Sequence, residues 1–385
     1  MSVQLGGIKE NWSAQEVGDG NINYVWIIKG PSGAFVLKQA ADFIRIVPTW
    51  RLTKKRVWWE RRSFLEYFKY CPSRVPKQIF FNEQYSLNVM EYCHPHIILR
   101  KGLISGNIYP KLAEHVSEYL AQTLFHTSDL YLKSEEKRKL MMDFVDNSLI
   151  HLTESVIFHE PYITHQNNHW TNEQILHDEI SSIQSDAFLK FEVSQLKEKF
   201  MNFTQALIHG DLHTGSIMVT NEDTKIIDTE FAFFGPMGFD IGAYLANLWL
   251  SYFSHQGLIK HGKEENTQYT KWLEDQAIQT WDSFVLKFVK LWEEEKKGEM
   301  YSFDTGLAQT KFIENLWQDT VGYAGCKMIR RIIGIAHVED LESIKDTQIR
   351  ADCEVKILKF AKHLILNRRT IPHMNYISSL LSTSM

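Results

Sequence analysis

The residues best suited to chemistry lie in two short acidic motifs. Residues 209–216 read HGDLHTGS and contain Asp211, and residues 228–230 read DTE and begin with Asp228. Phosphoryl transfer needs one carboxylate that accepts the proton of the attacking hydroxyl, and further carboxylates that hold magnesium at the phosphates. A general base of this kind typically contributes about 10²- to 10⁴-fold to a rate. The two motifs are therefore candidates for phosphoryl-transfer chemistry.

The ordinary role of these aspartates has to be weighed against the catalytic one. Most aspartates act as turn residues or caps, and Asp211 or Asp228 alone would favour that role. The complete motif, with a hydrophobic strand before the second aspartate, is much harder to obtain by chance. Two β-like segments, 216–219 and 225–227, flank residues 220–224 and predict a hairpin. Such a hairpin would bring both carboxylates to the same site, so we favour the catalytic interpretation.

A glycine-rich turn near the N-terminus is a candidate for phosphate binding. Gly18, Gly20 and Asn23 belong to the stretch GDGNIN, which lies between two β-like runs. Such a turn could fold over phosphates and offer its backbone N–H groups. Glycine-rich hairpin turns are common, so this signal is weak by itself.

Lys38 lies within an apolar strand, where a buried ammonium group is costly unless it is paired. It should therefore meet a carboxylate or a phosphate, and Glu60, on the predicted helix that follows, is the natural partner. A lysine on an edge strand that faces water is a frequent alternative. The glycine-rich turn before Lys38 and Glu60 after it together favour a role in orienting phosphate.

The segment of Glu91, Tyr92 and Cys93 ends the β-rich part of the chain. Exposed backbone carbonyl and amide groups there could bind the edge of an adenine ring. A plain linker between two lobes is nearly as good an explanation, and these residues alone do not separate the two.

The hydrophobic patterning predicts an α+β architecture with two lobes. Residues 1–93 form a β-rich lobe with strands expected at 16–20, 22–28, 34–39, 78–81 and 86–90 and one helix at 54–70. Residues 94–385 form a larger helical lobe, with apolar stripes at helical spacing in 112–126, 192–206, 239–252, 270–292, 310–336 and 353–367. The polar stretch 154–175, rich in Asn and His, is expected to be a loop.

The composition bounds the class of protein. The chain has 385 residues, 44% of them apolar, and a net charge of −5, which argues against general binding to nucleic acid or to anionic lipid. The longest apolar run, 239–253, is interrupted by Asp240 and Asn247 and is too short to span a membrane. The four cysteines are far apart and form no C-x-x-C pair, as fits a reducing compartment. We therefore expect a soluble, cytoplasmic protein.

The sequence resembles the protein-kinase-like fold in its small-molecule branch, and within it the 5-methylthioribose kinase family. The matching segments extend from near residue 13 to near residue 365 and include 16–23, 99–104, 113–115, 209–218, 230–242, 325–331 and 337–341. The motif HGDLHTGS is specific, because Ser216 stands where related sugar and antibiotic kinases usually have Asn. The resemblance implies ATP-dependent phosphorylation of the 1-hydroxyl of 5-methylthioribose, a step of methionine salvage.

The resemblance also implies a bilobal kinase-like fold and roles for the acidic residues. Asp211 would be the base toward the sugar hydroxyl, and Asp228 and Glu230 would hold Mg²⁺. The residues expected at ATP are Gly18, Gly20, Asn23, Lys38, Glu60, Glu91, Tyr92 and Cys93.

The substrate side of the site rests on three further residues. Arg330 and Arg331 match a twin-arginine pair that contacts the substrate or the developing phosphate charge, and forked guanidinium groups suit both. A solvated helix face or an ion-pair cluster is the ordinary role of such a pair. Trp50 resembles a tryptophan near the substrate pocket of the family, and it could equally be a packing residue. The family suggests a homodimer.

Three departures from the family pattern concern the site. The usual Asp-Pro-Glu is here Asp228, Thr229 and Glu230, which keeps both carboxylates but loosens the backbone, since threonine does not fix φ. We expect magnesium binding to survive this change. The stretch 47–50 is shorter than its usual counterpart, and residues 91–93 stand where an Asp-Leu pair is more common.

Two other functions stay open. One is a related kinase of another sugar, choline or an aminoglycoside. A site for a cation should be acidic, whereas the paired arginines fit a neutral sugar that becomes anionic. The other is a nucleotide-binding pseudokinase that acts as a scaffold. The joint presence of Lys38, Asp211, Asp228 and Glu230 argues against it, because a scaffold does not need the base.

Overall fold

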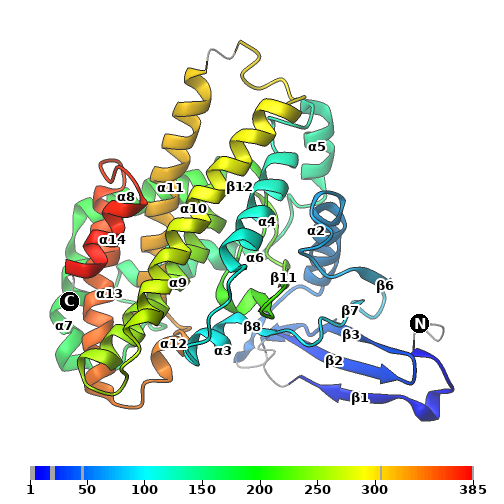
Figure 1. Cartoon of the computed structure of the whole chain (residues 1–385), viewed down its shortest axis with the longest axis horizontal. Coiled ribbons are helices and arrows are strands. Elements are labelled where there is room, and N and C mark those ends of the chain that lie inside the picture. Colours follow the sequence, from blue (N-terminus) through cyan, green and yellow to red (C-terminus); the bar gives the residue numbers. More distant parts are fainter. Residues whose placement is uncertain (1–4, 18–21, 45–46, 304–305, 384–385) are drawn as a thin grey trace.

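A five-stranded antiparallel sheet forms the N-terminal lobe, at the lower right of Figure 1. The structure is a computed structural model that describes residues 5–17, 22–44, 47–303 and 306–383. The strand order is β1 (Ser13–Glu16), β2 (Asn23–Gly30), β3 (Gly33–Ala40), β7 (Leu87–Glu91) and β6 (Gln78–Asn82). β-Branched and aromatic residues favour a strand in β2, and a tight turn pairs its last residue, Gly30, with Gly33 of β3. β4 (Phe43–Ile44) and β5 (Val47–Arg51) pair separately.

The helical lobe is built around α9 (Met237–Lys260), which packs against the long helices α10 and α11. These three helices lie side by side in Figure 1. Buried residues occur on all sides of α9, as expected for a helix at the centre of a core. The other helices of this lobe are α3 (Leu99–Ile104), α4 (Leu112–His126), α5 (Ser134–Met142), α6 (Leu149–Phe158), α7 (Glu173–Ser185), α8 (Ala187–Asn202), α10 (Thr267–Glu295), α11 (Leu307–Ile333), α12 (Glu339–Glu342), α13 (Thr347–Asn367) and α14 (Met374–Thr383).

Short strands carry the two acidic motifs at the edge of the helical lobe. β9 (Ala206–Ile208) leads into the first motif and pairs with β12 (Phe233–Gly235), which follows the second. Between them, β10 (Ile217–Val219) and β11 (Thr224–Ile226) form the expected hairpin, with β8 (Ile97–Ile98) beside β10. Both motifs are therefore fixed by backbone pairing on each side.

Helix α2 (Arg56–Tyr70) lies between the sheet and the helical lobe. Its side chains Trp59, Phe64 and Tyr67 are buried in the large hydrophobic core of the helical lobe. The sheet has only a small separate core, in which Phe35 and Val89 are buried. Helix α2 thus contacts both lobes, because it also packs against β3, β6 and β7 of the sheet.

The predicted elements agree with the structure except in three places. The strand expected at 16–20 lies earlier, because β1 is Ser13–Glu16, and residues 18–20 are outside the described residues. The expected loop at 154–175 is present over 159–172, where it includes a short 3₁₀ turn at Glu160–Tyr162, but it is too long at both ends, because α6 continues to Phe158 and α7 starts at Glu173. The side chain of Asn172 accepts hydrogen bonds from the N–H groups of Gln174 and Ile175, so this polar residue caps a helix. The expected helix at 192–206 is too long, because α8 ends at Asn202 and Ala206 begins strand β9.

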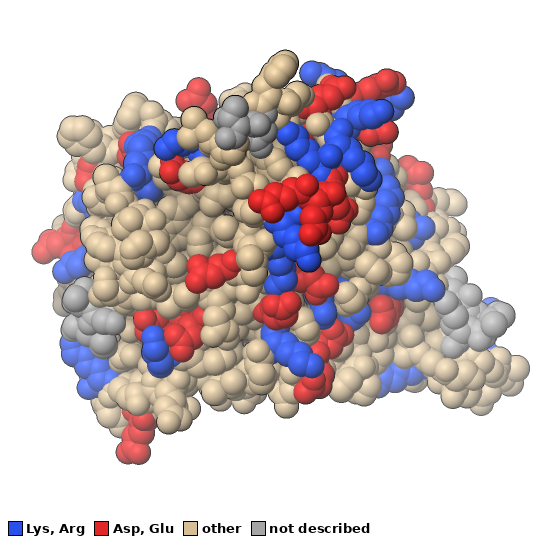
Figure 2. All heavy atoms as spheres, turned by 45° about the horizontal axis from the view of Figure 1, so that its top comes forward, with Lys and Arg blue, Asp and Glu red and all other residues tan. Residues whose placement is uncertain are grey.

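Charged side chains of both signs are interspersed on the face of the molecule in Figure 2, so that face has no broad field of one sign. None of the described helices is long and apolar enough to cross a membrane. All four cysteines are buried and unpaired.

Candidate active site

The loop that carries Asp211 is held by a buried carboxylate at the start of α9. Asp240 accepts hydrogen bonds from the backbone N–H groups of His209 (2.6 Å) and Gly210 (3.0 Å). Gly210 has φ +81°, and a side chain there would collide with the carbonyl oxygen of Phe231. Burial raises the pKa of Asp240, and the first turn of a helix favours a carboxylate. The backbone just before Asp211 is therefore held in place by Asp240.

The Asp211 carboxylate has one donor on each oxygen. Lys327 Nζ, from α11, donates to Oδ1 at 2.9 Å, and His213 Nε2 lies 3.3 Å from Oδ2. Burial alone would raise the pKa of Asp211, but the charge of Lys327 and the hydrogen bond from His213 outweigh it and hold that pKa well below its usual range. Asp211 is therefore ionised at any working pH, with its plane fixed by two partners.

His213 is a neutral donor to Asp211. Its Nδ1 accepts the N–H of Gly215 at 2.9 Å and lies 3.4 Å from Nη2 of Arg100, so the ring proton belongs on Nε2. Burial lowers the pKa of His213 to about 4, although the Asp211 carboxylate opposes this shift; nearby arginines lower it further. The ring therefore stays uncharged at neutral pH.

Asp228 follows β11 and is held from the other lobe. Lys38, on β3, pairs with the Asp228 carboxylate and, at 2.7 Å, with Glu60 on α2. The pairing predicted between Lys38 and Glu60 is present, and both side chains are buried. Burial opposes ionisation of Asp228, but Lys38 outweighs it and lowers the pKa of that carboxyl. The Asp228 side chain remains 45% exposed and can meet a ligand.

The two residues after Asp228 are buried. Glu230 Oε2 accepts the side-chain amide of Asn23 at 2.9 Å and lies 3.4 Å from Nε of Arg56. Thr229 Oγ1 lies 2.6 Å from the hydroxyl of Ser63. The threonine that replaces the usual proline is therefore anchored by its side chain.

Asp228 and Glu230 are the carboxylates that could bind a metal ion. Among the described residues, no three His, Cys, Asp or Glu side chains gather as a ready metal cage. Mg²⁺ in kinases usually takes one or two carboxylates together with phosphate oxygens and water. The half-exposed Asp228 fits this requirement, and both contacts of the Glu230 side chain described above use Oε2.

The arginine pair lies at the end of α11, near Asp211. Nη1 of Arg330 and Nη1 of Arg331 both donate to the carbonyl of Ala336, at 2.9 and 3.2 Å. Burial lowers the pKa of each, and the negative charge of Asp211 opposes that shift in both. Nε of Arg330 is buried without a hydrogen-bond partner among the described residues. Together with Lys327 they make the surroundings of Asp211 strongly cationic.

The other predicted residues make no described contact with Asp211, or are not described. Gly18 and Gly20 fall outside the described residues. Trp50 is partly buried on β5, and no hydrogen bond or ion pair between described residues joins it to Asp211. Tyr92 is partly buried and Cys93 is buried at the lobe junction.

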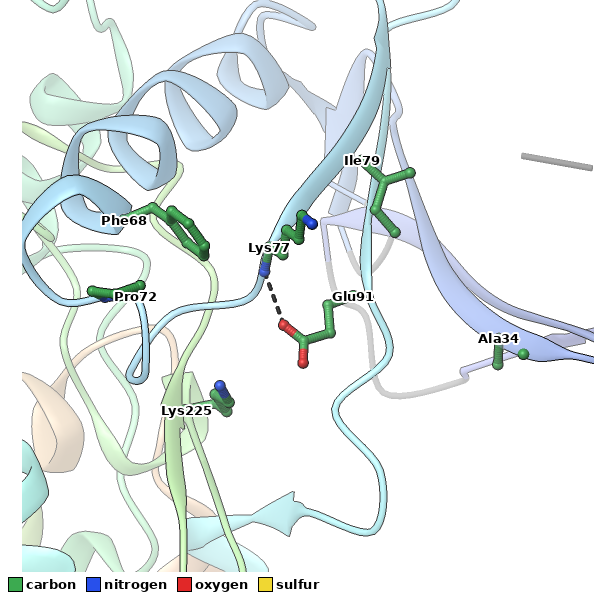
Figure 3. Close-up of a pocket in the computed structure, with 8 residues that line it drawn as sticks. Ala34, Phe68, Pro72, Lys77, Ile79, Glu91 and Lys225 are labelled. Carbon is green, nitrogen blue, oxygen red and sulfur yellow. Dashed lines mark hydrogen bonds between the residues drawn. The ribbon is translucent and has the colours of Figure 1, made fainter. Parts of the chain in front are cut away.

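The Glu91 side chain points into a hollow of about 480 Å³ at the lobe junction, shown in Figure 3. One of its oxygens accepts the backbone N–H of Lys77 at 3.0 Å, and Lys225 and Phe68 line the same hollow.

Sequence reasoning assigned no role to Lys327, His213, Arg100 or Asp240. Lys327 precedes Arg330 by one helical turn, which places the two on one face of α11. That helical spacing from Arg330 could have identified Lys327 as a residue of the site. The contacts of Arg100 and Asp240 with the loop of Asp211 join distant parts of the chain, so no local pattern showed them.

Comparison with known proteins identifies first the broad enzyme family of the chain and then its relatives. Residues 13–272 match the Phosphotransferase enzyme family. Methylthioribose kinase 1 of Oryza sativa subsp. japonica is 44% identical over 383 residues, which cover 96% of this chain and 88% of that protein. Methylthioribose kinase of Escherichia coli O45:K1 (strain S88 / ExPEC) is 41% identical, covering 98% and 92%. The chain belongs to the methylthioribose kinase family, as its sequence motifs predict, and its two-lobed α+β fold is confirmed.

Among solved structures, choline kinase from Cryptosporidium parvum Iowa II aligns over 97% of this chain and 94% of that one. The sequence identity is 12% and the TM-score 0.47. A likeness of this extent adds nothing to the family assignment.

Proposed function

We propose that the protein transfers the γ-phosphoryl group of ATP to the 1-hydroxyl of 5-methylthioribose, in methionine salvage. The observation that carries this proposal is the Asp211 carboxylate, ionised and oriented by Lys327 and His213 near the partly buried Arg330 and the buried Arg331. Relatives over 40% identical along nearly the whole chain are named methylthioribose kinases.

Asp211 would receive the proton of the sugar hydroxyl as the bond to phosphorus forms. Its depressed pKa makes it a weak base, which suits a loose transition state in which little proton transfer is needed before the phosphoryl group moves. Orientation of the hydroxyl is then the larger part of its contribution. Arg330 and Arg331 would bind the sugar and the charge that develops on the transferred group.

Lys38, fixed by Glu60, would orient the phosphates of ATP, and Asp228 would hold the magnesium ion at them. Bound Mg²⁺ supplies charge neutralisation at the phosphate oxygens. Glu230 is the second predicted ligand, through the oxygen that Asn23 does not occupy. Gly18, Gly20 and residues 91–93 complete the proposed ATP site, with residues 1–93 as its lobe and 94–385 as the substrate lobe.

One assay tests the function directly. ATP consumption is measured with 5-methylthioribose, ribose, choline and an aminoglycoside at equal concentrations, each with and without magnesium. We expect magnesium-dependent turnover with 5-methylthioribose and little with the cationic compounds, because cations meet the buried arginines unfavourably. Preference for choline or the aminoglycoside would refute the substrate, and the absence of turnover with every compound would favour the pseudokinase.

The family resemblance also motivates a proposal on oligomeric state and cellular location. We propose a cytoplasmic homodimer. Analytical ultracentrifugation of the purified chain should give a species of about twice the monomer mass of 45.1 kDa, and a monomer at micromolar concentration would contradict it.

A further inference from the structure

Helix α2 carries three buried polar side chains on one face. Arg56, Glu60 and Ser63 are spaced four and three residues apart, so they follow one stripe of the helix. Their exposed fractions are 0%, 1% and 0%. Buried charge and buried hydroxyl groups are costly unless they are partnered, so the partners of this stripe are informative.

The partners are three consecutive residues of the other lobe. Glu60 reaches Asp228 through the ammonium group of Lys38. Ser63 Oγ lies 2.6 Å from Thr229 Oγ1, and that threonine hydroxyl also donates to the carbonyl of Glu60 at 3.2 Å.

The third partner is Glu230. Nε of Arg56 lies 3.4 Å from Glu230 Oε2 and donates to the side-chain oxygen of Asn23 at 3.0 Å. The other two nitrogens of the guanidinium donate to the carbonyls of Thr53 (2.7 Å) and Ile22 (3.0 Å). Arg56 therefore joins the start of α2, the strand after the glycine-rich turn and the acidic motif.

The geometry of the motif needs such support. Asp228 has φ +68°, a left-handed conformation that is uncommon for residues other than glycine. Thr229 and Glu230 are buried at 0% and 2% exposure, whereas the Asp228 side chain is 45% exposed. Fixing the two buried residues therefore sets where the exposed carboxylate points.

We propose that the stripe of Arg56, Glu60 and Ser63 is a positioning element, which holds Thr229 and Glu230 so that Asp228 faces the nucleotide site. The Thr229 hydroxyl is its most specific contact, because proline at that position could not make it. The inference rests on the proposed function, since it concerns binding of ATP with magnesium.

The test compares Thr229→Val with Thr229→Ser. Valine keeps the shape of threonine and removes the hydroxyl, whereas serine keeps the hydroxyl. ATP binding to each variant is measured by calorimetry with Mg²⁺ and with EDTA, and thermal unfolding is recorded without ligand. We expect Thr229→Val to weaken ATP binding in Mg²⁺ about five- to tenfold, with less than a twofold change in EDTA. Thr229→Ser should bind within about twofold of wild type in both.

A second variant separates coupling from general damage. Ser63→Ala should weaken binding in Mg²⁺ in the same direction, and the double variant with Thr229→Val should be no worse than Thr229→Val alone. Additive losses, equal losses in EDTA, or wild-type binding by Thr229→Val would each overturn the positioning role. If wild-type protein itself shows no magnesium-dependent ATP binding, the proposed function fails rather than this inference.

Discussion

The two carboxylates of the proposed active site, Asp211 and Asp228, are held in opposite ways. Asp211 takes its contacts from within the helical lobe, where Lys327 and His213 hold the carboxylate and Asp240 holds its loop. Asp228 is held by Lys38, which comes from the sheet. The proposed base is therefore formed whatever the position of the sheet, whereas the proposed metal side depends on the contact between the lobes.

The packing of the two lobes strengthens this contrast. The helical lobe has one large continuous core, and the sheet has a small one of its own. Helix α2 contributes side chains to the large core and also contacts the sheet, and its Glu60 holds Lys38. Loss of a contact on the Asp211 side should therefore change chemistry, and loss of one on the Asp228 side should change nucleotide binding.

Replacement of the base should have the largest effect. Asp211→Asn keeps the size of the side chain and removes the charge that receives the proton. We expect kcat to fall about 10²- to 10⁴-fold while the affinity for ATP with magnesium stays within about twofold. Steady-state kinetics and calorimetry check both values, and a parallel loss of ATP affinity would remove the contrast between the two sides.

Asp228→Asn should show the opposite pattern. The variant leaves Lys38 with one carboxylate partner and removes the charge proposed to meet the metal. We expect the affinity for ATP to fall at least tenfold in Mg²⁺ and to change little in EDTA. A magnesium titration of ATP binding is the measurement, and a curve that matches wild type would contradict the metal role.

Arg330→Ala should affect the sugar and leave the nucleotide alone. The guanidinium lies among the cations near Asp211, and its loss should raise the KM for sugar or lower kcat by about tenfold. The affinity for ATP is the internal control. Unchanged sugar kinetics would return Arg330 to a structural role at the end of α11.

Lys327→Met should change the pH dependence more than the maximal rate. In wild type the pKa of Asp211 lies well below its usual range, so protonation of this group should not reduce activity between about pH 5 and 8. Without Lys327, burial raises that pKa, and the variant should lose activity as the pH falls through the new value. A profile of kcat/KM that matches wild type down to pH 5 would show that Lys327 does not control the charge of Asp211.

Much of the fold and the acidic pair could be predicted because their signals are local. The hairpin of β10 and β11 and the motifs around Asp211 and Asp228 lie within thirty residues of sequence. The loop expected at 154–175 was too long at its C-terminal end because its polar residues include a helix cap, Asn172, which composition alone does not distinguish from a loop residue.

The partners of the acidic pair could not be predicted in the same way. Lys327 is more than a hundred residues from Asp211, and Arg56 is still farther from Glu230. Thr229 was expected to loosen the backbone, but its buried hydroxyl bonds to α2 show how the residue is anchored. Such contacts depend on how the lobes pack, which no spacing in the sequence records.

A crystal structure with 5-methylthioribose, magnesium and a non-hydrolysable ATP analogue would test most directly whether Asp211 binds the sugar hydroxyl and Asp228 the metal. It should place the sugar O1 about 2.6–3.2 Å from an Asp211 oxygen, with Asp228 on the metal. A sugar bound with O1 turned away from Asp211, or a metal held without Asp228, would contradict it.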